Sequence, residues 1–395
     1  MITIDEAHAL IAASAPIRAS ETVALGDALG RVLSQPVIAV LDSPRQAVSA
    51  MDGYAVRDGD VAGVGARLDV VGESFAGVGF DGPVGTRQAV RIFTGAPLPD
   101  GATRVICQEN VDRDGDVAII ARDYGPGWHV RAGASDFAAG AVLLAAGALL
   151  TSRALVAAAA ADVATLIVAK RPRIAIIATG DELAAPGSAR AQRFAIPESV
   201  SIGVAAAAQS WGGSVVSRAM AGDDFDALVG AAGEALASAD LVICTGGASV
   251  GERDYAKAMF EPHGLELIFS KVAMKPGKPV WLGRVGGALL LGLPGNPTSA
   301  MVTARLFLGP LLAAMQGRSV ADALQWRNLP LAAALPAALE RESFIRAAWG
   351  DDGLVPLANQ DSGSQAALTG ADWLIRCRAG QAALPAGTSV QALAF

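Results

Sequence analysis

The sequence is poor in the residues that most often bind metals or form disulfides. It contains three histidines and three cysteines among 395 residues, and it has no CxxC pair. Neither a zinc site nor a disulfide framework is therefore indicated, and histidine-based catalysis is disfavoured. A Walker A sequence is also missing, which excludes a P-loop NTPase.

Membrane and nucleic-acid signals are weak as well. The composition is 52% hydrophobic, much of it alanine, and the apolar run over 154–169 contains Asp162. That run is shorter than the roughly 20 residues of a membrane-spanning helix. The first residues carry no basic segment typical of a signal peptide. A net charge of -7 disfavours non-specific nucleic-acid binding. We expect a cytoplasmic protein that binds neither nucleic acid nor a membrane.

Lysine is rare and unevenly distributed. The chain has five lysines, and Lys271, Lys275 and Lys278 fall within eight positions. Lysine presents a compact charge to phosphate or another oxyanion, whereas arginine presents a planar fork. A solvated basic turn is the simple explanation, but glycine-rich segments lie on both sides, at 245–251 (TGGASVG) and 293–297 (LPGNP). We therefore expect an anion site, with Lys271 and Lys275 as the principal pair and Lys278 at a turn.

The order of the expected elements indicates a multidomain α/β plus β protein. A capping box at Thr3–Glu6 predicts an N-terminal helix, and short β-rich runs separated by glycine turns fill 44–137. We predict a discontinuous helical linking domain (1–43 and 138–169) around an inserted β domain (44–137). We also predict an α/β domain over residues 170–318 and a small C-terminal β barrel over residues 319–395.

Within 170–318, apolar strands alternate with helices. Strands are expected at 173–178, 214–217 and 240–244, and helices at about 199–211 and 225–238. This alternation predicts a mostly parallel sheet with helices on both faces. Two strands end in Thr-Gly, at Thr179 and Thr245. Because open α/β sheets bind ligands at the carboxyl edge, we expect a binding site there.

The loop at 245–251 allows two functional interpretations. It contains G-x-S-x-G, which would make Ser249 the nucleophile of a serine hydrolase. The only later histidine, His263, follows too closely for the usual chain order of a triad. The alternative is a glycine-rich loop that approaches phosphate and is followed by a carboxylate for Mg²⁺. Its residues would be Thr245, Gly246, Gly247, Ser249 and Asp254.

Six motifs in order carry a resemblance to one family. They are SAMDGYAV at 49–56, FTGAPLP at 93–99, TGDEL at 179–183, TGGASVG at 245–251, MKPGKP at 274–279 and LPGNP at 293–297. Together they resemble MoeA, the molybdopterin molybdenumtransferase family, which is similar to the E domain of gephyrin. The resemblance covers nearly the whole chain, and six ordered motifs are far more specific than any one of them.

The resemblance implies a transferase of molybdenum cofactor biosynthesis. Such an enzyme binds molybdate and adenylylated molybdopterin, releases AMP with Mg²⁺, and leaves molybdenum on the dithiolene. The family fold is an elongated homodimer of four-domain subunits, with the site between subunits and an α/β domain like that of the molybdopterin adenylyltransferase. That adenylyltransferase is the implied upstream donor, and molybdoenzymes are the implied acceptors.

Matched motif by motif, the resemblance also implies the site residues. The catalytic group is Asp52, Thr94, Asp136, Glu182, Lys271 and Lys275. The substrate-binding group is Arg131, Thr245, Gly246, Gly247, Ser249, Asp254, Lys278, Pro294, Pro297, Arg346 and Ser364. Glu182, Asp223 and Asp254 would hold Mg²⁺, and Lys271, Lys275 and Arg346 would hold molybdate or phosphate oxygens.

One segment departs from the family pattern. Where the family often carries Asp-Ser-Asn before a helix, residues 196–200 read IPESV. The change removes an amide and inserts a proline, so the contacts of this segment to pterin or nucleotide are open. A divergent paralogue with a shifted substrate and a non-catalytic molybdopterin-binding scaffold are therefore alternatives to the transferase.

Overall fold

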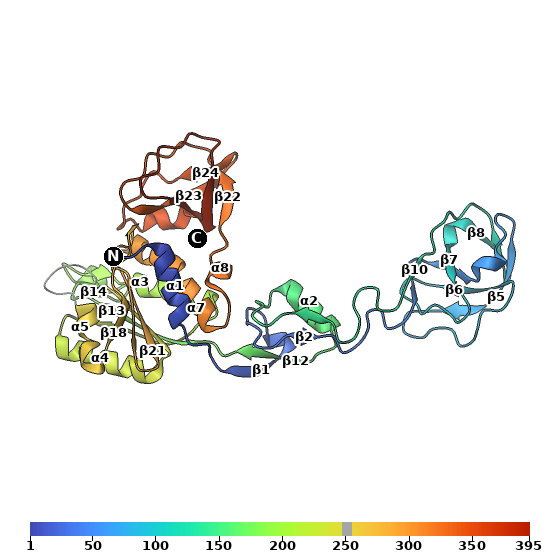
Figure 1. Ribbon diagram of the computed structural model, residues 1–395, viewed down its shortest axis with the longest axis horizontal. Coiled ribbons are helices and arrows are strands. Elements are labelled where there is room, and N and C mark those ends of the chain that lie inside the picture. The colour runs from blue at the N-terminus through green and yellow to red at the C-terminus, as the bar shows by residue number, and fades with distance from the viewer. Residues whose placement is uncertain (247–254) are drawn as a thin grey trace.

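The computed structural model describes residues 1–246 and 255–395, and the chain in it is strongly elongated (Figure 1). The α/β sheet and the C-terminal strands lie together at one end. Small two-stranded sheets and one helix occupy the middle. The inserted β sheet forms the other end, beyond a thin connection. The inserted β sheet therefore lies far from the α/β domain, whereas both chain termini lie at the α/β end.

The α/β domain is built on a six-stranded sheet. In spatial order its strands are β16 (Ser214–Ala221), β13 (Arg173–Thr179), β17 (Leu241–Thr245), β21 (Ala288–Leu293), β20 (Trp281–Val285) and β18 (Glu266–Phe269). The first four are parallel, β20 runs antiparallel to them, and β18 pairs antiparallel with β20 and so runs in their direction again. The sheet is thus mostly parallel, as predicted.

Helices cover both faces of this sheet because its buried strands are apolar on both sides. Ile174 and Ile176 of β13 pack with α3 (Val200–Ser210) in one core cluster. Ala175 and Ile177 pack with α4 (Phe225–Ser238) in a second cluster on the opposite face. A short helix, α5 (Tyr255–Ala258), joins the second cluster through Ala256.

A long apolar helix lies inside this domain. Its consecutive parts are α6 (Pro297–Thr303), a π-helical turn (Ala304–Leu308) and α7 (Gly309–Met315). By length and composition Pro297–Met315 passes the test for a membrane span, but 89% of it is buried inside the protein. It is therefore accounted for as a core helix of the domain.

The N-terminal helix belongs to the same core. Helix α1 (Ile4–Ser14) begins with the predicted capping box between Thr3 and Glu6. Its buried side chains, including Ile11, join the core cluster of α7, and His8 Nε2 lies 2.8 Å from the Leu306 carbonyl oxygen. The prediction that this helix forms a layer with 138–169 is therefore wrong, because its apolar stripe is buried against α7.

The middle of the molecule pairs distant segments. Strand β1 (Ser20–Ala24) pairs with β12 (Thr165–Ala169), and β2 (Val37–Ile38) pairs with β11 (Val142–Leu144). Helix α2 (Ser152–Ala160) packs on them. The helical character expected of the 138–169 segment is wrong after Ala160. Asp162 has a φ of 62°, which ends the helix, and the β-branched residues that follow favour a strand.

The inserted β domain is a separate six-stranded sheet. In spatial order its strands are β7 (Arg104–Cys107), β4 (Gly53–Val56), β6 (Gln88–Ile92), β5 (Arg67–Ser74), β9 (Val117–Ile120) and β8 (Val111–Asp114). The short strands β3 (Val48–Ser49) and β10 (Val130–Arg131) pair where the chain enters and leaves it.

The C-terminal strands form a small sheet that takes one strand from the α/β domain. Its spatial order is β19 (Met274–Lys275), β23 (Glu342–Gly350), β25 (Trp373–Cys377), β26 (Ser389–Ala394) and β22 (Arg327–Pro330), with β24 (Gly353–Pro356) paired to β23. A bridge between Leu331 and Leu354 brings the end of β22 back to β24. Because Lys275 pairs with Ser343, the lysine cluster lies at the junction of the two domains.

Candidate functional site

Three loops meet at the carboxyl edge of the α/β sheet. Gly246 follows β17 with a φ of 95°, and a Cβ atom there would lie 2.5 Å from the Thr179 carbonyl oxygen. A Cβ atom on Gly295, after β21, would lie 3.2 Å from the Gly246 Cα. Only glycine allows the loops after β13, β17 and β21 to approach so closely. The motifs with Thr-Gly and Pro-Gly therefore shape one edge of the sheet.

A pocket of about 610 Å³, here called the sheet-edge pocket, opens beside these loops. It gathers five of the predicted site residues, namely Glu182, Thr245, Gly246, Pro294 and Pro297. Its other walls come from the segment 196–200 and from Gly363 and Gln365. The prediction of a binding site at this edge is therefore matched by a concave surface.

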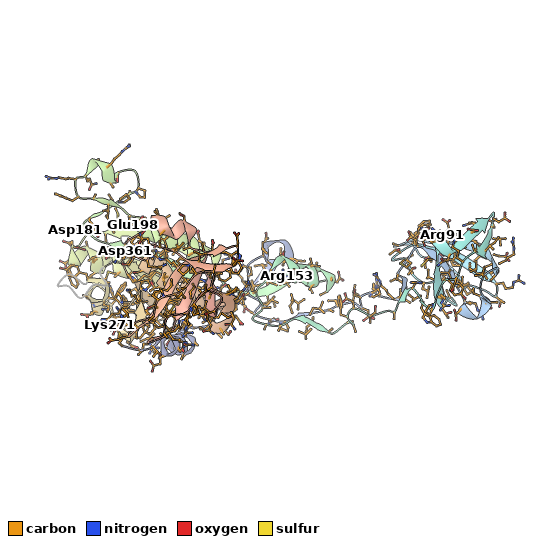
Figure 2. The ribbon with its side chains drawn as sticks, turned by 90° about the horizontal axis from the view of Figure 1, so that it is seen from above. Arg91, Arg153, Asp181, Glu198, Lys271 and Asp361 are labelled. Atoms are coloured by element: carbon orange, nitrogen blue, oxygen red, sulfur yellow. The ribbon has the colours of Figure 1, made fainter. Side chains whose placement is uncertain are left out.

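A second pocket of about 530 Å³, here called the lysine pocket, lies between the α/β domain and the C-terminal sheet. Lys275 and Lys278 line it together with Arg341, and all three lysines of the cluster are exposed. Lys271 does not line it, and Figure 2 places this residue well away from Glu198 and Asp361. The structure thus groups Lys275 with Lys278, not with Lys271 as predicted, because the chain turns at 276–279.

The two pockets adjoin each other. Pro279 lines both, and the loop 360–365 forms a wall of each. Ser362 faces the lysine pocket and Gly363 faces the sheet-edge pocket. A ligand with two chemically different ends can therefore lie across this shared wall.

Arg346 holds that wall in place. Its side chain is 1% exposed, and its guanidinium donates to Thr298 Oγ1 (3.1 Å) and to the carbonyl oxygens of Asn359 (3.0 Å) and Asp361 (3.1 Å). Burial lowers the pKa of Arg346, although the nearby Asp361 carboxylate opposes this shift. Arg346 therefore supports the loop, and the prediction that it holds molybdate or phosphate oxygens is corrected because its hydrogen-bonding nitrogens are engaged inside the protein. Ser364, in the same loop, accepts from Asn359 Nδ2 at 3.0 Å.

Replacing Arg346 with lysine is expected to lower the stability of the chain by about 3 kcal/mol. A single ammonium group cannot replace three hydrogen bonds of a planar fork, and buried acceptors would lose their donors. A fall of several degrees in the thermal unfolding midpoint would be the measurement. An unchanged midpoint would show that Arg346 does not hold the loop.

In the β domain, the predicted site residue Asp52 forms hydrogen bonds with Thr94, another predicted site residue. Asp52 Oδ1 accepts from both the backbone N–H and the hydroxyl of Thr94, each at 2.7 Å. These two hydrogen bonds, followed by the positive charge of Arg91, lower the pKa of Asp52. Arg91 stacks on Tyr54 and Phe93, at 5.2 and 4.8 Å from the ring centres. The motifs at 49–56 and 93–99 thus meet in the β domain.

The remaining predicted residues are dispersed. Arg131 ends β10, and Asp136 lies exposed in the connection, where its N–H donates to the Ser43 carbonyl oxygen at 2.9 Å. Asp223 follows β16, and its N–H donates to Asp181 Oδ1 at 2.8 Å. Gly247, Ser249 and Asp254 lie outside the described residues. One chain therefore does not bring the β-domain residues to the two pockets (Figure 1).

The serine hydrolase interpretation finds no support in the placement of His263. Its Nε2 lies 3.0 Å from the Val229 carbonyl oxygen in α4. This contact engages the histidine with the outer face of the domain. The required nucleophile, Ser249, lies in the segment that the structure does not describe.

Several pocket residues were not among the predicted site residues. Pro279 and Asn296 stand within the motifs at 274–279 and 293–297, whereas Glu198, Gly363 and Gln365 stand outside all six motifs. Glu198 stands in the segment 196–200 that departs from the family pattern, which was the one available hint. Gln365 comes from the C-terminal domain, and no local motif marks a residue that reaches a pocket across a domain junction.

The described residues do not by themselves provide a complete set of side-chain ligands for a metal ion. Among them no three His, Cys, Asp or Glu side chains gather closely enough to hold a metal ion. Mg²⁺ commonly uses one or two carboxylates and fills its other positions with water and phosphate oxygens. The Glu182 carboxylate, folded back over Gly180 at the pocket, fits that role.

The fold and the pockets define a multidomain protein with a pocket at the carboxyl edge of an α/β sheet. Residues 2–161 match the MoeA N-terminal region (domain I and II), 175–314 match a "probable molybdopterin binding domain", and 328–395 match the MoeA C-terminal region (domain IV). Together these matches cover most of the chain.

Named relatives agree with these matches. A molybdopterin molybdenumtransferase 2 of Mycobacterium tuberculosis is 40% identical over 311 residues, 75% of each chain. The molybdopterin molybdenumtransferase of Haemophilus influenzae is 34% identical over 84% of this chain and 80% of its own. A crystal structure of the molybdopterin biosynthesis MoeA protein from Pyrococcus horikoshii has a TM-score of 0.80 at 26% identity, covering 100% of this chain and 99% of that one. The chain belongs to the MoeA family.

Proposed function

We propose that this chain is a molybdopterin molybdenumtransferase of molybdenum cofactor biosynthesis. Its substrates would be molybdate and adenylylated molybdopterin. Water would cleave the phosphoanhydride of the adenylyl group, so that AMP leaves and molybdenum stays on the dithiolene sulfurs. Membership of the MoeA family and relatives named for this activity support the proposal.

The observation that carries the proposal is the pair of adjoining pockets with different chemistry. The lysine pocket presents Lys275, Lys278 and Arg341, which suit a tetrahedral dianion such as molybdate. The sheet-edge pocket presents glycine-shaped backbone and the Glu182 carboxylate. A pterin with an anionic dithiolene side and an adenylyl group would use both at once.

When bound, Mg²⁺ would neutralise charge that develops on the phosphate oxygens. Glu182 would hold it, and Asp223 and Asp254 are further candidates from the sequence. The residues of the chain then have simple roles. The loops at 245–246 and 294–297 orient the phosphate-bearing part, and the lysines bind the molybdate oxygens.

We propose further that the working unit is a homodimer. Asp52 and Thr94 lie at one end of the elongated chain and the two pockets at the other (Figure 1). A two-fold assembly would bring the β domain of one copy to the pockets of its partner. Donation by an adenylyltransferase, delivery to molybdoenzymes and a cytoplasmic location stay predictions.

The test is an assay with purified protein, adenylylated molybdopterin, Mg²⁺ and molybdate. The proposal expects AMP release that depends on molybdate and ceases when Mg²⁺ is chelated. Binding of molybdopterin without any AMP release would instead identify a non-catalytic scaffold.

A further inference from the structure

The two adjoining pockets carry opposite charge among their described lining residues. Among the described residues, the sheet-edge pocket is lined by the carboxylates of Glu182 and Glu198 and by neither lysine nor arginine. The lysine pocket, across Pro279, has three basic side chains and one acid, Asp361. Glu182 is exposed, whereas Glu198 is 7% exposed. Glu198 is therefore a fixed, internal negative charge of the sheet-edge pocket.

Glu198 is held by a built network. Its Oε1 accepts from the Ser201 N–H at 2.7 Å, and its Oε2 accepts from the Ser201 hydroxyl at 2.6 Å. Its own N–H donates to the Ala184 carbonyl oxygen at 2.8 Å, which extends the pairing of β14 (Leu183–Ala184) with β15 (Ile196–Pro197). Both carboxylate oxygens and the backbone are thus fixed, so the side chain cannot swing away from the pocket without losing two hydrogen bonds.

This network occupies the start of α3. The residue before the helix, Ser199, makes no side-chain cap, and its hydroxyl donates to Gln365 Oε1 at 3.3 Å. Glu198 provides the cap from one position earlier. Free amides at the start of a helix attract phosphate, but here a carboxylate of the chain already uses the Ser201 amide. A phosphate that approached α3 would meet that negative charge.

We propose that Glu198 excludes free anions from the sheet-edge pocket and thereby determines how the substrate lies. Its carboxylate takes the place of a bound phosphate at α3. The sheet-edge pocket then accepts an uncharged ring, or phosphate whose charge a cation has neutralised, and the anionic dithiolene and molybdate go to the lysine pocket. The orientation of the substrate rests on the proposed function, but the exclusion of anions does not.

The experiment compares wild type with Glu198→Gln, which removes the charge and keeps atoms that can bond Ser201. AMP, adenosine and inorganic phosphate are titrated by calorimetry in the presence of EDTA. The dissociation constant of AMP is expected to fall about 10-fold in Glu198→Gln, the effect of removing one charge at close range in a partly solvated site. Adenosine, which has no phosphate, is expected to bind both proteins equally. Glu234→Gln on α4 makes the same charge change outside both pockets and is expected to match wild type.

Several outcomes would overturn the inference. One is an AMP affinity that is unchanged or weaker in Glu198→Gln. Another is an equal gain for adenosine, which would indicate a change of shape and not of charge. In a parallel titration with Mg²⁺ in place of EDTA, a loss of Mg²⁺-dependent AMP binding in Glu198→Gln would make Glu198 a metal ligand instead. If Glu198→Gln does not fold, Glu198→Ser is compared in the same way, because its hydroxyl can still accept a hydrogen bond.

The result separates this inference from the proposed function. A gain in AMP affinity in a protein that never releases AMP with molybdate would contradict the transferase and support the role of Glu198. Molybdate-dependent AMP release by wild type, with no gain in AMP affinity in Glu198→Gln, would support the transferase and contradict the role of Glu198. If neither protein binds AMP, the titration with inorganic phosphate tests the exclusion of anions. Binding to Glu198→Gln but not to wild type supports exclusion, and equal binding contradicts it.

Discussion

Replacing Lys275 with alanine is expected to lower molybdate-dependent AMP release about 100-fold, the usual effect of removing one preorganised charge from a reacting centre. Lys275 lies in β19 at the domain junction, and its exposed side chain lines the lysine pocket. Its backbone pairing with Ser343 does not depend on the side chain. The unfolding midpoint should therefore change little while the reaction slows.

Lys170→Ala is the matched control. Lys170 is an exposed lysine at the end of β12 that lines neither pocket. It should keep wild-type turnover. Equal rates for wild type and Lys275→Ala at saturating and at low molybdate would remove Lys275 from the site, whatever the family resemblance implies.

A second large effect is expected at Asp52. Asp52→Asn should reduce AMP release about 100-fold, because the amide removes the negative charge that the β domain contributes. Asparagine can still accept from the Thr94 N–H and hydroxyl, so the local structure should persist. Unchanged release in Asp52→Asn would show that the β domain takes no part in the reaction.

The pH dependence of AMP release tests the roles of Asp52 and Thr94 independently. Hydrogen bonds from Thr94 lower the pKa of Asp52, so its charged form persists at lower pH than for an ordinary aspartate. The contribution of that charge to the rate is lost as pH falls through the lowered pKa of Asp52 in the folded protein. Thr94→Val removes one of the two hydrogen bonds and raises the pKa, so the acidic limb of the rate profile should move to higher pH. Thr94→Ser should restore it, and an unmoved limb in Thr94→Val would contradict this role.

Local chemistry made much of the fold predictable. The capping box of α1, the apolar strands at 173–179 and 241–245 and the helix over 225–238 follow from residues that are close in sequence. The association of α1 with α7 could not be predicted this way. An apolar stripe indicates that a helix is buried, but not against which partner. Likewise, Asp162 interrupts a helical pattern through a backbone conformation that composition does not reveal.

In the candidate site, too, some features could be predicted from neighbouring residues and others depend on how the domains pack. Glycine motifs marked the sheet edge, and Gly246 and Pro294 are found there. The pairing of Lys275 with Lys278, the buried Arg346 and the contribution of Gln365 depend on how the C-terminal sheet packs on the α/β domain. That packing joins residues more than 60 positions apart, so spacing along the chain carries no signal for it.

We propose that each complete site combines the two pockets of one copy with the β domain of another, an arrangement that an experiment can test. It is tested most directly by a heterodimer of an Asp52→Asn chain and a Lys275→Ala chain, purified through two different affinity tags. If sites are shared between copies, one of the two sites carries both changes and the other carries none, so AMP release should return to about half the wild-type rate. If each site lies within a single chain, every site carries one change, and the heterodimer should be as slow as either variant alone.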